Sequence, residues 1–186
     1  MKLFCTLLFI QLFFHFSYAA DRKEVVSPDG KIKVTVEINP EVRYTVSYEN
    51  RLILQPSIIN LLLYHGISLS GKLSIKKLTR RSNNSVILSP VPEKRKNIPD
   101  IYNELTIRFN APISVVFRVY NDGVSYRFLT HVKDSIIIQE ENAEFNFPGN
   151  HPVYFSQVVK RDNADIFHTS FEEPYHVKPI DSLTDS

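Results

Sequence analysis

The chain has 186 residues, and its 22 Lys and Arg side chains nearly balance 20 Asp and Glu, which gives a formal net charge of +2. This balance provides no general attraction to nucleic acid or to an anionic membrane, so we expect neither partner for the processed protein. The chain has one cysteine, Cys5, so its stability has to come from core burial and not from a disulfide within the chain.

The first 19 residues predict a secretory signal peptide, expected to be helical. Lys2 precedes an apolar stretch from Leu3 to Phe16, which is shorter than the roughly 20 apolar residues of a membrane-spanning helix. Ser17 and Ala19 place small side chains at the −3 and −1 positions of a cleavage site after Ala19. The sequence therefore predicts a periplasmic or secreted protein in which residues 20–186 form one domain with a net charge of +1.

Apolar and polar residues alternate along most of residues 20–186, as in strands with one packed face and one wet face. No window of about a dozen residues shows a helical period. The expected strands are 32–38, 42–48, 52–54, 58–63, 73–78, 86–88, 104–109, 114–120, 124–130, 135–139, 143–147 and 153–159.

The run Ile58–Leu63 is apolar on both faces apart from Asn60. It predicts a central strand that is covered on both sides, which favours two stacked sheets over one open sheet. The expected fold is therefore an all-β, antiparallel, two-sheet β-sandwich.

The segment Asn121-Asp122-Gly123 predicts a hairpin turn. A two-residue loop of Asp122 and Gly123 would place Arg118 directly opposite Arg127, and facing like charges destabilise a strand pair. We therefore expect a three-residue loop with Gly123 in the left-handed conformation, which pairs Arg118 with Tyr126.

Residues Lys72–Lys96 form a basic, polar segment in which Glu93 is the single acid. Its end, Pro90–Pro99, has three prolines and predicts a long exposed loop. No aromatic residue lies between Lys72 and Lys96 to stack on a base, so a solvated loop is a better interpretation than a nucleic-acid site.

The sequence alone identifies no catalytic or metal-binding residue. Glycosidic cleavage usually needs two carboxyl groups that flank one bond, and each acid here has a structural explanation. The histidines have no zinc-ligand spacing, and Asp162-Asn163-Ala164-Asp165 is more typical of a turn than of a calcium loop. Tyr48, Tyr64, Tyr102 and Tyr154 are candidates for stacking on a sugar, although aromatic residues favour strands in any case.

Several motifs together resemble the N-terminal domain of glycoside hydrolase family 97. The resemblance covers essentially all of residues 20–186, and the Tyr-Asn-Asp-Gly segment is its most specific part. The motifs are Ser27-Pro28-Asp29-Gly30-Lys31, Gln55-Pro56-Ser57, Tyr102-Asn103-Glu104-Leu105, Phe117–Phe128, Glu144-Phe145-Asn146-Phe147-Pro148 and Phe171-Glu172-Glu173-Pro174-Tyr175.

The resemblance implies a galactose-mutarotase-like sandwich that joins a catalytic (β/α)₈ barrel in α-glucosidases or α-galactosidases, with calcium near the substrate. This chain stops at Ser186, before the family's catalytic acids and calcium ligands, so the sandwich is expected to be inactive alone and to carry no cofactor. It is expected to be truncated, with a sandwich that is incomplete at its C-terminus. The implied role is to pack against the barrel and form one wall of the carbohydrate site, for which the candidate residues are Asn103, Glu104, Arg118, Tyr120, Asn121, Asp122, Gly123 and Arg127.

Two alternatives remain open at this point. A free-standing exported module would bind carbohydrate alone as a monodisperse protein. An enzyme complete in itself would hydrolyse aryl α-glucosides without any further domain.

Overall fold

The computed structural model describes residues 21–38, 40–91, 94–156 and 172–183. They form strands and two short 3₁₀ turns, Tyr64–Gly66 and Ile180–Ser182, and confirm the predicted all-β class. Within these residues no helix is long and apolar enough to cross a membrane. The strands are β1 Asp21–Val26, β2 Ile32–Ile38, β3 Val42–Tyr48, β4 Arg51–Leu63, β5 Ile75–Leu88, β6 Asn97–Phe109, β7 Ile113–Tyr120, β8 Val124–Thr130, β9 Ile138–Ala143, β10 Pro152–Phe155 and β11 His176–Pro179.

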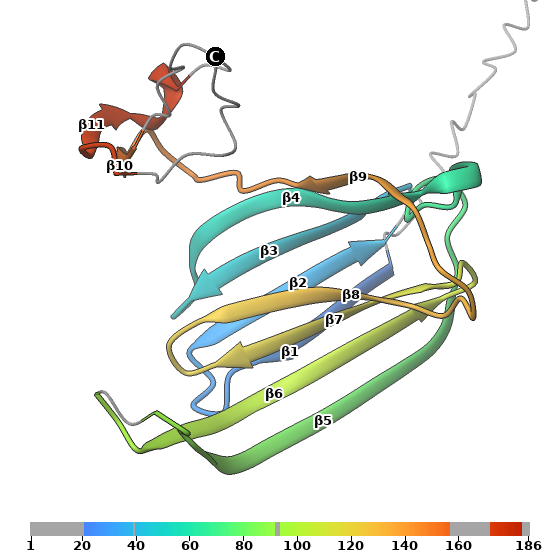
Figure 1. The fold of residues 1–186 in the computed structure, drawn as a ribbon, viewed down its shortest axis with the longest axis horizontal. Helices are drawn as coiled ribbons and strands as arrows, with labels where there is room; N and C mark the ends of the chain where they lie inside the picture. The colour runs from blue at the N-terminus through green and yellow to red at the C-terminus, as the bar shows by residue number, and fades with distance from the viewer. Residues whose placement is uncertain (1–20, 39, 92–93, 157–171, 184–186) are drawn as a thin grey trace, which may run out of the picture.

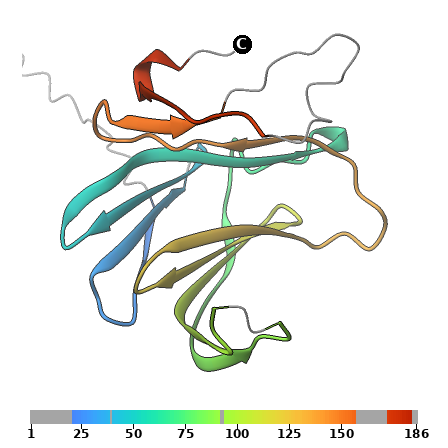
Figure 2. The same cartoon turned by 60° about the vertical axis from the view of Figure 1, so that its left-hand side comes forward.

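The strands form two stacked antiparallel sheets (Figures 1 and 2). The first sheet has five strands in the order β1-β2-β3-β4-β9, and the second has four in the order β5-β6-β7-β8. The remaining strands, β10 and β11, pair with each other beside the five-stranded sheet (Figure 1). The predicted two-sheet sandwich is therefore confirmed.

The core lies between the sheets because alternate residues of each strand point inward. In β2, the residues Ile32, Val34, Val36 and Ile38 are buried, while the polar residues between them are partly exposed. The facing strands β6 and β7 supply inward residues from the second sheet: Leu105, Ile107, Phe109, Val115, Phe117 and Val119.

An aromatic cluster joins the two sheets. The ring of Tyr44 in β3 lies 5.7 Å from that of Phe117 and 5.8 Å from that of Tyr126, and all three contacts within the cluster are tilted. Such tilted contacts are favourable beyond the area they bury. Burial, followed by the neighbouring Tyr126, raises the pKa of the Tyr44 hydroxyl to about 12.

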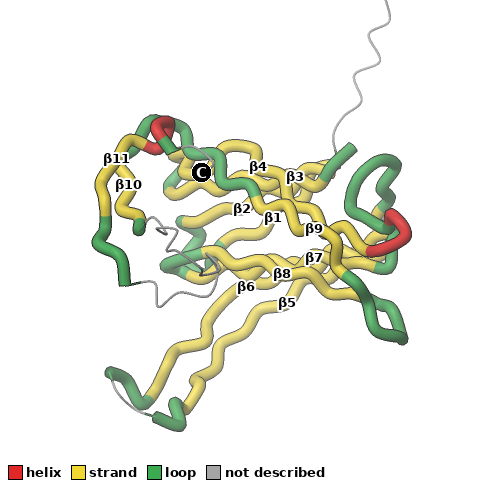
Figure 3. Tube along the Cα trace, turned by 45° about the horizontal axis from the view of Figure 1, so that its top comes forward, coloured by secondary structure: helices red, strands yellow, loops and turns green. Residues whose placement is uncertain are grey.

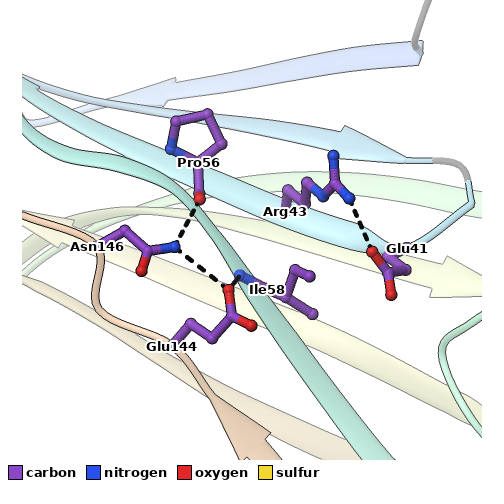
Figure 4. Close-up of polar contacts among 6 residues, drawn as sticks. All are labelled: Glu41, Arg43, Pro56, Ile58, Glu144 and Asn146. Atoms are coloured by element: carbon purple, nitrogen blue, oxygen red, sulfur yellow. Dashed lines mark hydrogen bonds and ion pairs between the residues drawn. The ribbon is translucent and has the colours of Figure 1, made fainter.

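Strand β4 is continuous across Pro56, which has no backbone N–H to donate (Figure 4). The segment that follows β9 runs along this part of β4 and supplies side-chain partners. The Asn146 side-chain amide donates to the Pro56 carbonyl at 2.9 Å, and the Glu144 carboxylate accepts from the Ile58 N–H at 3.0 Å. Two side chains thus complete the pairing where the proline interrupts it.

Several strand boundaries differ from those predicted. The expected strands 52–54 and 58–63 are one strand, β4, because the contacts at Pro56 allow it to continue. Strands 73–78 and 86–88 are likewise one strand, β5, which pairs along its whole length with β6. β6 begins at Asn97, so the predicted loop Pro90–Pro99 is wrong for its last three residues, which belong to a strand.

The second face of β4 is also less covered than predicted. Ile59, Leu61 and Leu63 are buried, whereas Ile58, Asn60 and Leu62 are only partly buried. β4 is nevertheless an interior strand, with β3 and β9 as its neighbours. Strands β1 and β11 were not predicted, and the end of the predicted strand 153–159 lies outside the described residues.

The β7–β8 turn differs from the prediction in register and conformation. Arg118 pairs with Ser125 and not with Tyr126, although it does not oppose Arg127, as expected. The Tyr120 N–H donates to the Gly123 carbonyl at 2.8 Å, so Asn121 and Asp122 make the connection. Gly123 is not among the residues with positive φ. Shifting the loop by one residue separates the two arginines without a left-handed glycine.

We predict that Glu144→Ala lowers the free energy of unfolding by about 1–3 kcal/mol, because it leaves the Ile58 N–H without its carboxylate acceptor. Urea denaturation followed by tyrosine fluorescence measures the change. The control is Glu41→Ala, which removes the ion pair of Glu41 with Arg43, whose side chains are 35% and 45% exposed. We expect the control to lose about 0–1 kcal/mol. Equal losses in the two variants would contradict the role given to Glu144.

We also predict an alkaline loss of stability that depends on Tyr44. Its pKa rises from 10.0 to about 12 on folding, so the neutral hydroxyl is favoured in the folded state. Its contribution is fully present below the unfolded pKa of 10 and disappears as the pH rises towards 12. In thermal melts across this range, Tyr44→Phe should decline less steeply than the parent, while the control Tyr154→Phe, at a 74% exposed tyrosine, should decline like it.

Candidate functional site

Four of the eight candidate wall residues, Glu104, Arg118, Tyr120 and Arg127, lie on the outer face of the four-stranded sheet. Glu104 in β6 and Arg118 in β7 are cross-strand partners, and their side chains form an ion pair at 2.8 Å. The Arg118 guanidinium lies 4.3 Å from the centre of the Tyr102 ring. The Tyr102 ring is in turn 5.2 Å from that of Tyr120. Register places these side chains together, because Tyr102 opposes Tyr120 just as Glu104 opposes Arg118.

The Glu104–Arg118 pair is more buried than the other ion pairs among the described residues. The Glu104 side chain is 10% exposed and that of Arg118 is 31% exposed. The hydrogen bond from Arg118 to Glu104 raises the pKa of the guanidinium, and this outweighs the lowering effect of burial. The carboxylate of Glu104 is thus engaged by a permanent cation, which gives it a structural role.

Asn103 points to the other face of β6, towards the five-stranded sheet. Its side-chain amide donates to the Val26 carbonyl at 2.9 Å and its oxygen accepts from the Ser82 hydroxyl at 2.7 Å. Arg80 also donates to the backbone of β1, at the Glu24 carbonyl. These contacts fasten β1 to the second sheet at the edge of the sandwich. The sequence gives no signal for this contact of Arg80, because only the pairing of the strands places Arg80 beside β1.

The candidate residues do not share one cavity. Asn103 and Glu104 belong to the lining of a hollow of about 360 Å³ between β1 and the β5–β6 pair. Arg118, Tyr120 and Arg127 belong to the lining of a shallow hollow of about 100 Å³ between β7 and β8. The first has the volume of a small-ligand site, but the side chains of Asn103 and Arg80 in it already bind the β1 backbone.

The turn residues Asn121, Asp122 and Gly123 lie apart from both hollows. The Asn121 side-chain oxygen accepts from the Asp29 N–H at 3.0 Å, which ties the β7–β8 turn to the β1–β2 turn. Asp29 also accepts from the Lys31 N–H at 3.1 Å, and the hydrogen bond from the Ser27 hydroxyl is the main cause that lowers the pKa of its carboxyl. Asn121 thus has a structural role, and Asp122 is exposed.

Several other acids among the described residues also have structural partners. Glu144 accepts from β4, as described above. Four more form surface ion pairs: Glu24 with Lys33, Glu37 with Arg22, Glu41 with Arg43 and Glu49 with Lys31. Among the described residues no three His, Cys, Asp or Glu side chains gather as a metal site, and Asp162 and Asp165 lie outside those residues.

Of the tyrosines considered for sugar stacking, Tyr102 is only 8% exposed and has Arg118 over its ring, so it presents no free face. Tyr48, Tyr64 and Tyr154 are exposed, and they come from three separate strands or turns. These four tyrosines therefore form no shared aromatic platform.

A model of the glycosyl-hydrolase 97 N-terminal family matches residues 25–186. The chain belongs to this family. It is similar to the retaining α-galactosidase of Bacteroides thetaiotaomicron, with 30% identity over 162 residues, which cover 86% of this chain and 24% of that protein.

Solved structures share the fold. A crystal structure of a β-arabinopyranosidase aligns with a TM-score of 0.71 at 24% identity, over 83% of this chain and 26% of the other. A glycoside hydrolase family 97 enzyme from Pseudoalteromonas sp. strain K8, in complex with acarbose, aligns with a TM-score of 0.69 at 23% identity, over 84% of this chain and 24% of the other. The chain thus spans about a quarter of the length of these relatives.

We predict that Glu104→Gln lowers the free energy of unfolding by about 2 kcal/mol, because it leaves Arg118 partly buried without its anionic partner. The matched control is Glu37→Gln in the ion pair with Arg22, whose side chain is 69% exposed. We expect the control to change stability by less than about 1 kcal/mol. If chemical denaturation gave the same value for both, the outer-face pair would be no more than a surface contact.

Proposed function

We propose that this chain is the non-catalytic N-terminal domain of an exported glycoside hydrolase that acts on α-glucosides or α-galactosides. Its role is to pack against a catalytic (β/α)₈ barrel and shape one wall of the sugar site. The observation that carries the proposal is the family match over residues 25–186, in a chain that corresponds to about a quarter of its relatives. The named α-galactosidase activity and the enzyme solved in complex with panose support the substrate class.

The arrangement of acids supports the non-catalytic role. Hydrolysis usually requires two carboxyl groups across one glycosidic bond, about 5–9.5 Å apart depending on stereochemistry. In the described strands, Glu104 is held by Arg118 and Glu144 by the backbone of β4. These contacts give both carboxylates a structural task on different sheets, which leaves the chemistry to the barrel.

The resemblance also implies calcium for full-length members of the family. The described residues do not fit such a site, because no three His, Cys, Asp or Glu side chains gather among them. We therefore assign no step to calcium in this domain, and we propose that any calcium ligands belong to other parts of the enzyme.

Export follows from the leader. Residues 1–19 have the features of a signal peptide with cleavage after Ala19, and they lie outside the described residues. We propose that the protein is periplasmic or secreted and that it begins at Ala20 after processing.

A free-standing carbohydrate-binding module is the second candidate function. The observation that favours it is the exposure of Tyr154 and Tyr175, at 74% and 75%, since exposed aromatic rings can stack on sugars.

We predict that purified residues 20–186 release no nitrophenol from nitrophenyl α-galactoside or α-glucoside above a buffer blank, because the Glu104 and Glu144 carboxylates already have structural partners. The retaining α-galactosidase of B. thetaiotaomicron serves as the positive control. Release that disappears in Glu104→Gln would overturn the non-catalytic role. Calorimetric binding of panose that is lost in Tyr154→Ala would instead support the free-standing module.

A further inference from the structure

The far half of the β5–β6 hairpin extends beyond the rest of its sheet (Figure 3). Pairing between β6 and β7 ends at Tyr102 with Tyr120, whereas pairing between β5 and β6 continues from Asn84 with Ile101 to Leu88 with Asn97. Among the described residues, these ten form a two-stranded ribbon with no third strand beside it. We call this ribbon, with Val91 and Lys94–Lys96 at its end, the β5–β6 arm. Two-stranded ribbons are marginally stable in water unless they pack against another surface.

The arm exposes apolar side chains on both of its faces. Val86, Ile87 and Leu88 are consecutive, so their side chains alternate between the two faces, and they are 58%, 50% and 67% exposed. Ile98 opposes Ile87 across the ribbon and is 41% exposed, and Val91 beyond the strand is 68% exposed. A solvated ribbon would have polar residues on at least one face, and a contiguous apolar patch of this kind usually marks an interaction site.

Positive charge lies at the same end. Lys94, Arg95 and Lys96 are consecutive and exposed, and Glu93 is the single acid in the segment from Lys72 to Lys96. The arm therefore combines an apolar ribbon with a basic end. A partner that fits it needs an apolar interior and carboxylates at its rim.

We propose that the β5–β6 arm docks in a crease of the catalytic part of the enzyme, with apolar walls on both sides of the ribbon and acidic side chains beside Lys94–Lys96. This inference rests on the proposed function, because the catalytic part is the partner it names. A flat surface could cover only one face of the arm, so exposure on both faces favours a crease. A second copy of this chain is disfavoured by repulsion between two basic ends.

A lipid bilayer could also enclose both faces, but the composition of the arm favours protein. Segments that lie in a membrane interface usually carry Trp, Tyr or Phe at the headgroup level. No aromatic residue occurs between Lys72 and Pro99, and the apolar residues of the arm are Val, Leu and Ile. The test therefore treats lipid as a separate outcome.

The experiment compares hydrogen exchange in the isolated chain with that in the full-length enzyme of which it forms the N-terminal domain. Docking should slow exchange of the arm's amides by about tenfold or more in the full-length enzyme, because the arm is then packed on both faces. The reference surface is the exposed apolar pair Leu52 and Ile53 in β4, at 41% and 43% exposure. Slowing at this pair with none in the arm would overturn the proposal.

Matched variants of the full-length enzyme then test whether the arm holds the domain in place. Ile87→Ser with Leu88→Ser should restore fast exchange in the arm and raise the sensitivity of activity to heat, while Leu52→Ser with Ile53→Ser should do neither. All four positions are exposed in the isolated chain, so the isolated variants should retain the parental circular dichroism.

Two results separate the possible failures. A full-length enzyme that hydrolyses neither α-glucosides nor α-galactosides would refute the proposed function, whatever the arm does. An active enzyme whose arm exchanges as fast as in the isolated chain would refute only the docking. Co-sedimentation of the isolated chain with phosphatidylglycerol vesicles, abolished by Ile87→Ser with Leu88→Ser, would assign the arm to a lipid surface and overturn the docking as well.

Discussion

The packing of two apolar sheet faces against each other is the constraint on which the rest of the structure depends. No disulfide can help, since the only cysteine is Cys5 in the predicted leader, so the alternation of strands such as β2 has to be matched by inward residues of β6 and β7. Tyr44, Phe117 and Tyr126 fill the space between the sheets with rings from both sides. Once the inward faces are fixed, every outward residue is fixed too, because a strand has a period of two.

That coupling explains why several of the family motifs make structural contacts in pairs. Gln55-Pro56-Ser57 meets Glu144-Phe145-Asn146, which completes the pairing that the proline interrupts. Tyr102-Asn103-Glu104-Leu105 meets the strand that carries Arg118. The turn at Ser27–Lys31 meets Asn121. Each pair lies at a junction between strands, where a side chain has to replace or fasten backbone pairing.

The sequence could predict the sandwich and the positions of its core strands because alternation is a local signal. It could not predict β1, since Asp21-Arg22-Lys23-Glu24 has no alternation and is held by pairing with β2 and by Asn103 and Arg80 from the other sheet. It also could not predict that β4 continues through Pro56, because Glu144 and Asn146 are about 90 residues away in the sequence. The candidate wall was predicted as one site from contiguous motifs. In the structure Asn103 and Glu104 face opposite ways, as neighbours in a strand must.

The net charge and the average composition gave no indication of the exposed apolar surface on the β5–β6 arm. A net charge of +2 suggested no strong partner, and the polar composition of residues 72–96 suggested a solvated loop. Pairing along the whole of β5 and β6 turns that segment into a ribbon, and the ribbon places Val86, Ile87 and Leu88 beyond the reach of any third strand. Apolar residues that a loop could have folded back onto the core are thereby held away from it. The same pairing that extends the sheet thus creates an apolar surface that no other described strand covers.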